Sequence, residues 1–289
     1  MTDAASIPAP APRAGIAGVP AVPCRSLPGS RSPDWQPGRG DMALHSEIFA
    51  SSRDGTGGAA ALALALDQLR SARAEPGPLA EAEDRRAVLW VQERRAIRLT
   101  GRPYRPGLPE GLRHRLIHVE AENAQDVLFT LEEAVRCRDL AAVIGELAGN
   151  PRALDFTASR RLSLASERHG VPLFLVRLDA ERDLSSARMR WEVASHASPR
   201  PRWNADAPGA PSWQAELFRA RRHRPASFVL QEEEGGRLGA RPSTGPGRTD
   251  FGNGVMDGAM MSGAMMSGAM MSGERIGSFL ARFSRTRTA

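Results

Sequence analysis

Hydrophobic residues in the first two thirds of the chain fall into two alternating patterns. Short segments that resemble strands occur at residues 44–50, 87–91, 116–120, 141–147 and 171–178, and the one at 87–91 is a continuous apolar run, as expected for a strand covered on both faces. Between these segments, apolar residues recur every three or four positions, which predicts helices at residues 59–74, 123–136 and 156–169. Strands that alternate with helices through short connections predict a parallel sheet with helices on both faces.

The ends of two of these helices carry capping signals. Asn123 stands where an N-cap side chain can accept a backbone N–H bond, and Thr157 is the predicted cap of the helix at 156–169. Gly170 follows that helix directly and is placed to end it.

After residue 188 the pattern changes to strict alternation. Residues 189–193, 213–219 and 228–231 read as half-exposed antiparallel strands. The predicted fold class is therefore α/β, with a mostly parallel sheet, flanking helices and antiparallel strands at the C-terminal edge.

Both ends of the chain differ from this middle part, so three regions are expected. Residues 1–41 form a leader rich in Pro, Ala and Arg, and residues 239–289 form a low-complexity Gly/Met-rich tail; both are predicted to be disordered. Residues 42–238 form the folded domain, and either Met1 or Met42 can serve as the start. The sequence Gly-Ala-Met-Met-Ser occurs three times in the tail. The tail ends with apolar residues at the spacing of a short helix that could dock on a partner, namely Ile276, Phe279, Leu280 and Phe283.

The amino-acid composition excludes several classes of enzyme for this chain. All 39 Lys+Arg positions of the 289-residue chain are arginine, whereas P-loop hydrolases, Schiff-base enzymes and lysine general bases need a lysine. The net charge of +6 suits an anionic partner, although a GC-rich genome also favours arginine over lysine. Cys24 and Cys137 lie far apart, which is typical of a protein of the reducing cytoplasm. No apolar run is long enough to span a membrane.

A glycine-rich turn between the first strand and the first helix resembles a phosphate-binding loop. Its residues are Gly55, Thr56, Gly57 and Gly58, and Gly58 stands where the P-loop lysine would be. We predict that this turn is a vestigial phosphate loop without a cofactor. A looser dinucleotide-binding pattern, ending at Ala60, is the alternative, but an acid at the end of the second strand should hold the ribose, and the nearest candidate, Glu93, lies well beyond the expected distance of about 20 residues.

Glu146 follows the apolar run of the fourth strand, where a Walker B acid would hold magnesium. Without a lysine this acid has no working partner, so it is predicted to be either a vestigial Walker-B-like acid or a polar strand end at the rim of the sheet. The histidines do not cluster and no paired-cysteine spacing exists, so no metal site is expected.

The densest basic group follows the second alternating strand. It is a candidate contact for DNA phosphates, and the alternative is a charged edge strand protected against aggregation. Its members are Arg219, Arg221, Arg222 and Arg224.

Several segments together resemble the ImuA family of SulA/RecA-like accessory proteins of bacterial translesion DNA synthesis. The most specific are residues 140–147 (Leu-Ala-Ala-Val-Ile-Gly-Glu-Leu) and 157–162 (Thr-Ala-Ser-Arg-Arg-Leu). Residues 44–48, 116–121, 190–193 and 213–217 are also similar to that family. The resemblance covers roughly residues 42–238, whereas the leader and the Met-rich tail depart from the family.

The resemblance implies a RecA-like core with a degenerate Walker A motif and no enzymatic activity. It also implies induction in the SOS response and a mutagenic complex with ImuB, a Y-family-like polymerase homologue, and an error-prone DnaE-type polymerase. RecA is a further implied partner, and any contact with DNA would be indirect. Two alternatives stay open: a SulA-like inhibitor of cell division, and a nucleotide-binding enzyme that uses residues 55–58.

Overall fold

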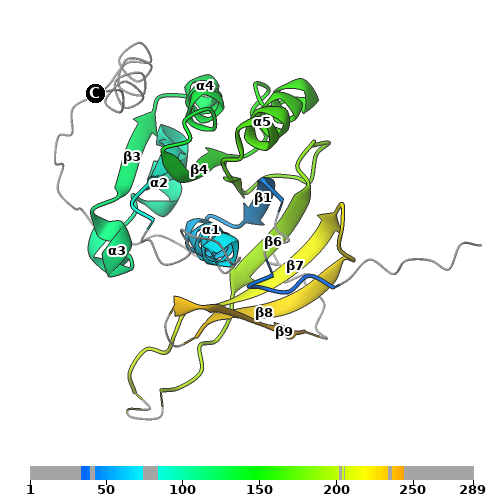
Figure 1. Cartoon of the computed structure of the whole chain (residues 1–289). Helices are drawn as coiled ribbons and strands as arrows, with labels where there is room; N and C mark the ends of the chain where they lie inside the picture. The colour runs from blue at the N-terminus through cyan, green and yellow to red at the C-terminus, as the bar shows by residue number, and fades with distance from the viewer. Residues whose placement is uncertain are drawn as a thin grey trace, which may run out of the picture. The chain divides into compact units, whose positions relative to one another are not determined.

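The computed structural model describes residues 34–39, 43–73, 84–201, 204, 206–233 and 236–243. These residues form a nine-stranded sheet with helices on both faces (Figure 1). The strand order is β3-β2-β4-β5-β1-β6-β7-β8-β9. The α/β class predicted from the sequence is confirmed, including the mostly parallel sheet and its antiparallel C-terminal edge.

Six strands run parallel to one another: β1 (His45–Ala50), β2 (Ala87–Glu93), β3 (Leu116–Ala121), β4 (Leu140–Ala148), β5 (Leu173–Leu178) and β6 (Met189–Ser195). Three antiparallel strands continue the sheet beyond β6: β7 (Ser212–Ala220), β8 (Ala226–Glu232) and β9 (Leu238–Pro242). The pattern predicts residues 189–193 as part of the antiparallel edge, but β6 pairs in parallel with β1 and is antiparallel only to β7.

The helices divide between the two faces of the sheet (Figure 1). On one face lie α1 (Gly57–Arg73) and α2 (Arg94–Thr100), and on the other lie α4 (Ala124–Ala134) and α5 (Phe156–His169). A 3-10 turn η1 (Arg105–Gly107) and the short helix α3 (Glu110–Arg113) connect α2 to β3. The sequence predicts no element in the basic stretch that holds α2 and α3. Among its many arginines, α2 buries Ala96 and α3 buries Leu112, which is too little apolar surface to produce a helical pattern in the sequence.

Each face of the sheet has its own apolar core. On the α4 and α5 side, Val127, Leu131 and Leu162 pack on the strands of the parallel half. On the other side, α1 lies over the parallel strands and also contacts β9, so that Leu230 and Leu238 join the same core as α1. The antiparallel edge therefore curls around α1 and covers the side of the helix that the parallel strands leave open (Figure 1).

Trp35 anchors the chain before β1 to this second core. The side chain is 1% exposed, and its ring lies 4.7 Å from that of Trp191 and 5.5 Å from that of Phe228, both in edge-to-face geometry. The predicted boundary at residue 42 assigns Trp35 to the leader, whereas the structure buries it under β6 and β8. Similarly, β9 extends past the predicted boundary at residue 238.

A buried ionic cluster covers the sheet beside α5. The Glu47 carboxylate accepts hydrogen bonds from Arg190 Nε at 2.7 Å and from Ser185 Oγ at 2.7 Å. Arg177 lies 3.8 Å from Glu47 and bonds Asp183 at 3.1 Å. These contacts fix the connection between β5 and β6, which takes the place of a covering helix there.

Two of the three predicted helix caps are confirmed and one is wrong. Asn123 accepts the N–H of Asp126 and caps α4, and Gly170 ends α5 in a left-handed conformation with φ 72°. The cap of α5 is Asp155, which accepts the N–H of Ala158 at 2.7 Å, whereas Thr157 lies inside the helix.

Several predictions concern segments outside the described residues. These are most of the leader, the start at Met42, the Gly-Ala-Met-Met-Ser repeats and the apolar residues at 276–283. Among the helices that are described, none has the length and apolar character needed to cross a bilayer.

Trp35→Ala should reduce the free energy of unfolding by about 3–5 kcal/mol, because the loss of a buried indole leaves a cavity between Trp191 and Phe228. Urea denaturation followed by circular dichroism would measure this loss. Tyr104→Ala, at a 75% exposed position, should change stability by no more than about 0.5 kcal/mol. Equal stability of the two variants would mean that the segment around Trp35 does not belong to the core.

Candidate functional site

The candidate site lies at the carboxyl ends of β1, β2 and β4, the edge of a parallel sheet where ligands most often bind. The vestigial phosphate loop joins β1 to α1 at this edge, and the connection from β2 to α2 lies beside it. The start of β7 and the β8–β9 turn reach the same edge because these strands are antiparallel.

Within the loop, several groups that could bind phosphate are occupied by the protein itself. Asp54 accepts hydrogen bonds from Thr56 Oγ1 at 3.2 Å and from the N–H of Ser195 on β6. The N–H of Ser52 bonds the Asp179 carboxylate at 2.9 Å. Gly55 takes a left-handed conformation with φ 64°. Two carboxylates beside the loop disfavour a phosphate there by charge repulsion.

Gly57 and Gly58 lie in close contact with the sheet. A Cβ at Gly57 would come within 2.8 Å of Val176 Cγ1, and a Cβ at Gly58 would come within 2.7 Å of both Glu146 Oε1 and Trp90 Cζ2. There is thus no room for any side chain at position 58, where a P-loop lysine would be. The loop differs from a working P-loop in its packing as well as in its chemistry.

Glu146 fills the space below Gly58. It is 2% exposed, and its Oε1 accepts the indole N–H of Trp90 at 2.8 Å. Its Oε2 accepts Gln92 Nε2 at 2.9 Å, and Thr100 Oγ1 lies 3.5 Å away. Burial raises the pKa of the Glu146 carboxyl, and the bonds from Gln92, Trp90 and Thr100 oppose that rise.

The predicted strand at 141–147 nearly coincides with β4, but Glu146 is buried and is not a polar group at the rim of the sheet. β4 continues through Leu147 to Ala148, and Glu93 at the end of β2 accepts the N–H of Ala148 at 3.0 Å. Leu147 and Ala148 are apolar enough to extend the strand, which moves Glu146 inside the sheet. Both of its carboxylate oxygens accept protein donors, so the acid is poorly placed to hold magnesium.

A row of hydrogen bonds continues from Glu146 across β2 to the outer strand β3. Gln92 Nε2 also donates to Gly101 O at 3.0 Å, and Gln92 Oε1 lies 2.8 Å from His118 Nε2. Burial lowers the pKa of His118, which favours the neutral ring. The row forms a polar floor at the edge of the sheet.

Above this floor lies a cavity of about 360 Å³, within the range of about 300–1,000 Å³ for small-ligand sites. Trp90, Tyr104 and Trp213 provide aromatic surface in its lining, and Leu62 and Leu238 provide aliphatic surface. Three arginines also line it: Arg70, Arg102 and Arg237. Apart from the glycine loop and Glu146, the sequence analysis did not identify these residues. Trp90 and Gln92 fall within or beside an apolar strand run, and Tyr104 lies in a stretch without a recognisable motif.

The predicted phosphate-contact arginines lie at the opposite edge of the sheet. Arg219 ends β7 opposite Arg190 at the amino end of β6, and the other three lie in the turn from β7 to β8. All four side chains are exposed, and in the described residues no ion pair joins any of them to an acid. The structure therefore separates this basic group from the vestigial phosphate loop.

A second buried polar pair lies under α5. His45 Nδ1 and Ser163 Oγ are 2.7 Å apart, and both side chains are fully buried. Burial lowers the pKa of His45 to about 4. The pair has no access to a substrate, so its role is structural. Across the described ranges, no group of three or more His, Cys, Asp or Glu residues is arranged to hold a metal ion.

Because His45 has a pKa near 6.5 in the unfolded chain and about 4 when folded, the unfolded state binds the extra proton first. Its contribution to stability is complete above about pH 6.5 and is lost as the pH falls toward 4. We expect His45 to lower the free energy of unfolding by about 2 kcal/mol between pH 7.5 and pH 5.

Urea unfolding of the wild type and of His45→Gln at both pH values would measure this difference. The variant should lose the His45 part of the pH dependence, whatever its stability at pH 7.5. His114→Gln, at an exposed position, should keep the dependence of the wild type. An unchanged pH dependence in His45→Gln would refute the assignment.

Gly58→Ala should reduce the free energy of unfolding by about 1–3 kcal/mol, because the new methyl group would force the Trp90–Glu146 pair to move. The matched control is Gly111→Ala in α3, where a Cβ would meet only Arg115 Nη2 at 3.8 Å. Thermal or urea unfolding of both variants tests the packing. If Gly58→Ala were as stable as the control, the space at position 58 would be open after all.

Comparison with known proteins identifies relatives for part of the chain. No protein-family model matches it. Two curated proteins, each named Protein ImuA, from Caulobacter vibrioides strains NA1000 / CB15N and ATCC 19089 / CIP 103742 / CB 15, are 34% identical to it over 164 residues. The match covers 52% of this chain and 62% of each relative, so the chain spans less than two thirds of their length. The resemblance predicted from the sequence is confirmed over the matched segment, where this chain is similar to ImuA.

Proposed function

We propose that this protein is a non-enzymatic accessory protein of damage-induced mutagenesis. The observation that carries the proposal is the 34% identity to ImuA over 164 residues. More specifically, the protein would act in error-prone translesion DNA synthesis, and its expression would be induced in the SOS response. It would act in the cytoplasm and bridge ImuB and a DnaE-type polymerase, with RecA as a further partner.

The state of the vestigial phosphate loop supports the non-enzymatic part of the proposal. A phosphoryl-transfer site needs a lysine on the β- and γ-phosphates and an acid free to hold Mg²⁺. Here Gly58 has no room for a side chain, and Glu146 accepts bonds from Trp90 and Gln92. The nucleotide-binding alternative would need a different way to hold phosphate.

The proposed organisation keeps the predicted division into leader, core and tail, with the boundaries moved to include Trp35 and β9. The tail would contribute through Ile276, Phe279, Leu280 and Phe283, docking as a short helix on a polymerase or on ImuB. This docking remains a prediction, as these residues lie outside the described part of the chain.

Deletion of the gene should lower the frequency of ultraviolet-induced mutation, measured as rifampicin-resistant colonies, without lowering the spontaneous frequency. Wild-type protein and Glu146→Gln should both restore it, since the proposal assigns no catalytic role to that carboxylate. Purified protein should show no ATP hydrolysis above background, with or without single-stranded DNA.

Overexpression separates the proposal from the SulA-like alternative. The accessory role predicts normal cell division, whereas an inhibitor of the division ring would produce undivided filaments. Filamentation together with unchanged induced mutagenesis in the deletion strain would contradict the proposal. A DNA-stimulated ATPase that disappeared in Glu146→Gln would contradict its non-enzymatic part.

A further inference from the structure

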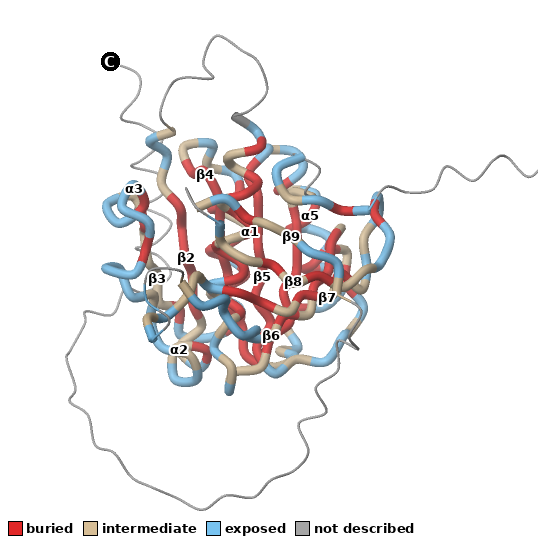
Figure 2. Tube along the Cα trace, turned by 90° about the horizontal axis from the view of Figure 1, so that it is seen from below, coloured by how far each residue is buried: buried red, intermediate tan, exposed pale blue. Residues whose placement is uncertain are grey.

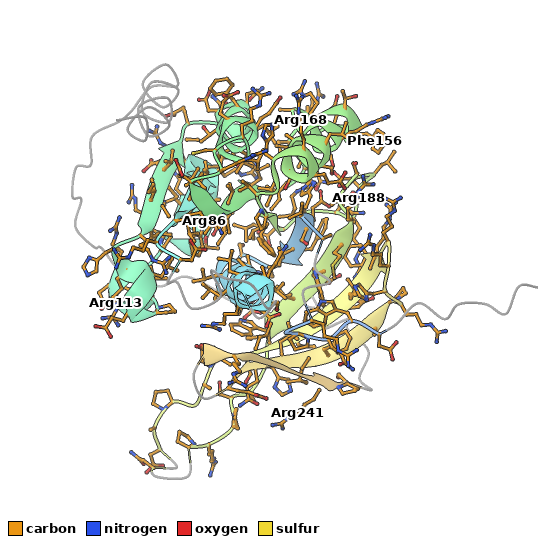
Figure 3. The ribbon with its side chains drawn as sticks, viewed as in Figure 1. Arg86, Arg113, Phe156, Arg168, Arg188 and Arg241 are labelled. Atoms are coloured by element: carbon orange, nitrogen blue, oxygen red, sulfur yellow. The ribbon has the colours of Figure 1, made fainter. Side chains whose placement is uncertain are left out.

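The segment between β2 and β3 is the most basic part of the described chain. Residues 94–115 contain seven arginines and one acidic residue, Glu110. Figure 2 shows α2 and α3 as largely exposed, beside the buried strands of the parallel half. Figure 3 shows Arg113 on α3, and Arg115 bonds the Arg86 carbonyl at 3.2 Å, which places the end of this segment beside the start of β2.

The exposed face of α2 carries two of these arginines, and a third, two residues beyond the end of the helix at Thr100, continues them as a stripe. Arg95, Arg98 and Arg102 follow one another at intervals of three and four residues, with the 43% exposed Leu99 between them. The opposite side of α2 carries the buried Ala96 and directs Thr100 toward Glu146. We name this stripe, together with Arg105, Arg113 and Tyr104, the arginine face.

Acidic residues compensate only part of this charge. Arg94 and Arg102 share Glu120, whereas Arg95 and Arg98 have no acid partner within the described ranges. Arg105 and Arg113 donate to main-chain carbonyls instead, namely Leu116 O at 3.1 Å and Leu108 O at 2.9 Å. These bonds orient guanidinium groups without neutralising them, so the arginine face keeps a net positive charge.

The arginine face ends at the mouth of the cavity described above. Arg102 and Tyr104 both line it, and Tyr104 is 75% exposed, so one side of its ring is open to a ligand. Farther in lie the indole of Trp90 and the polar groups of Gln92 and Glu146. A basic surface thus leads to an aromatic cavity with a polar floor.

We propose that the arginine face and the cavity together bind single-stranded nucleic acid, with phosphates on Arg95 and Arg98 and an unpaired base at Tyr104 in the mouth of the cavity. Single strands combine a polyanionic backbone with planar bases that stack on aromatic side chains. The arginines would then bind the phosphates, and the aromatic cavity would bind a base. A duplex keeps its bases paired and would leave the aromatic cavity empty, and an acidic peptide would use the arginines without needing Tyr104.

This site adjoins the vestigial phosphate loop, whose Gly55 and Gly58 line the same cavity, and lies at the other edge of the sheet from the Arg219–Arg224 group. It also does not depend on the proposed function, since a protein of another pathway could bind a single strand in the same way. If the protein did not bind a single strand, this inference would be refuted and the accessory role would stay open. Normal mutagenesis in a deletion strain would contradict the accessory role and leave this inference open.

The test is fluorescence anisotropy of the full chain with a labelled oligothymidine of about 16 nucleotides, at several salt concentrations. Arg95→Ala/Arg98→Ala should weaken binding and reduce the slope of log K against log salt by about 1.4, or about 0.7 for each lost phosphate contact on a single strand. The matched control is Arg221→Ala/Arg222→Ala, which removes the same charge from the opposite edge and should leave affinity unchanged. Equal weakening by the two double variants, or weakening by the control alone, would overturn the proposal.

Substitution of the tyrosine tests the stacked base. Tyr104→Ala should weaken binding by about 5- to 150-fold, the range that corresponds to the loss of one stacked base, and Tyr104→Phe should retain the wild-type affinity. If Tyr104→Ala bound as tightly as the wild type, the assignment of a base to the cavity would be wrong.

Competition separates nucleic acid from other polyanions. Unlabelled oligothymidine should displace the probe at much lower concentrations than polyglutamate of equal charge or a duplex of equal length. If polyglutamate competed equally well, the arginine face would be a site for acidic peptides and the proposal would fail.

Discussion

The hydrogen bond from Trp90 to Glu146 is the contact on which the functional edge of this protein depends. It joins neighbouring strands β2 and β4 through their side chains, on the face that α1 covers. Because Gly58 packs directly on this pair, the start of α1 lies close against the sheet. The same contact fills the space of a P-loop lysine, buries the only acid in a Walker B position, and forms the floor of the cavity. One pair of side chains therefore explains both why position 58 has no room for a lysine and why the cavity has a polar floor.

The rest of the core holds this edge in place from two sides. The antiparallel strands curl around α1 and bring Trp213 and Leu238 to the cavity wall. Trp35 packs beneath these strands through Trp191 and Phe228. On the opposite face, the buried Glu47–Arg190 pair fixes the turn that follows β5. Forming such a buried ion pair adds little to the free energy of unfolding, because both charges lose their hydration. Removing one partner usually costs several kcal/mol, so the cluster mainly constrains the position of the loop.

Much of the fold could be predicted because its signals are local. Short strand-like segments marked β1 to β5, helical spacing marked α1, α4 and α5, and Asn123 and Gly170 marked helix ends. The features that the sequence did not predict depend instead on contacts between residues that are far apart along the chain. β9 is five residues long and contains Gly239, so its pairing with β8 comes from tertiary contact. Glu146 resembles a strand end by its charge, and only the donors of Trp90 and Gln92, 56 and 54 residues away along the chain, make its burial tolerable. The cavity could not be predicted for the same reason, since its lining comes from segments that lie far apart along the chain.

The exclusive use of arginine has a consequence for how the arginine face can be controlled. Guanidinium groups stay protonated throughout the physiological pH range, and a chain without lysine offers no side-chain amine for acetylation or for isopeptide linkage. The charge of this face is therefore permanent, and neighbouring carboxylates can offset it without removing it, as Glu120 does for Arg102. The same absence is useful at the bench, because an amine-reactive dye finds no side chain to modify in these residues and leaves every arginine contact intact.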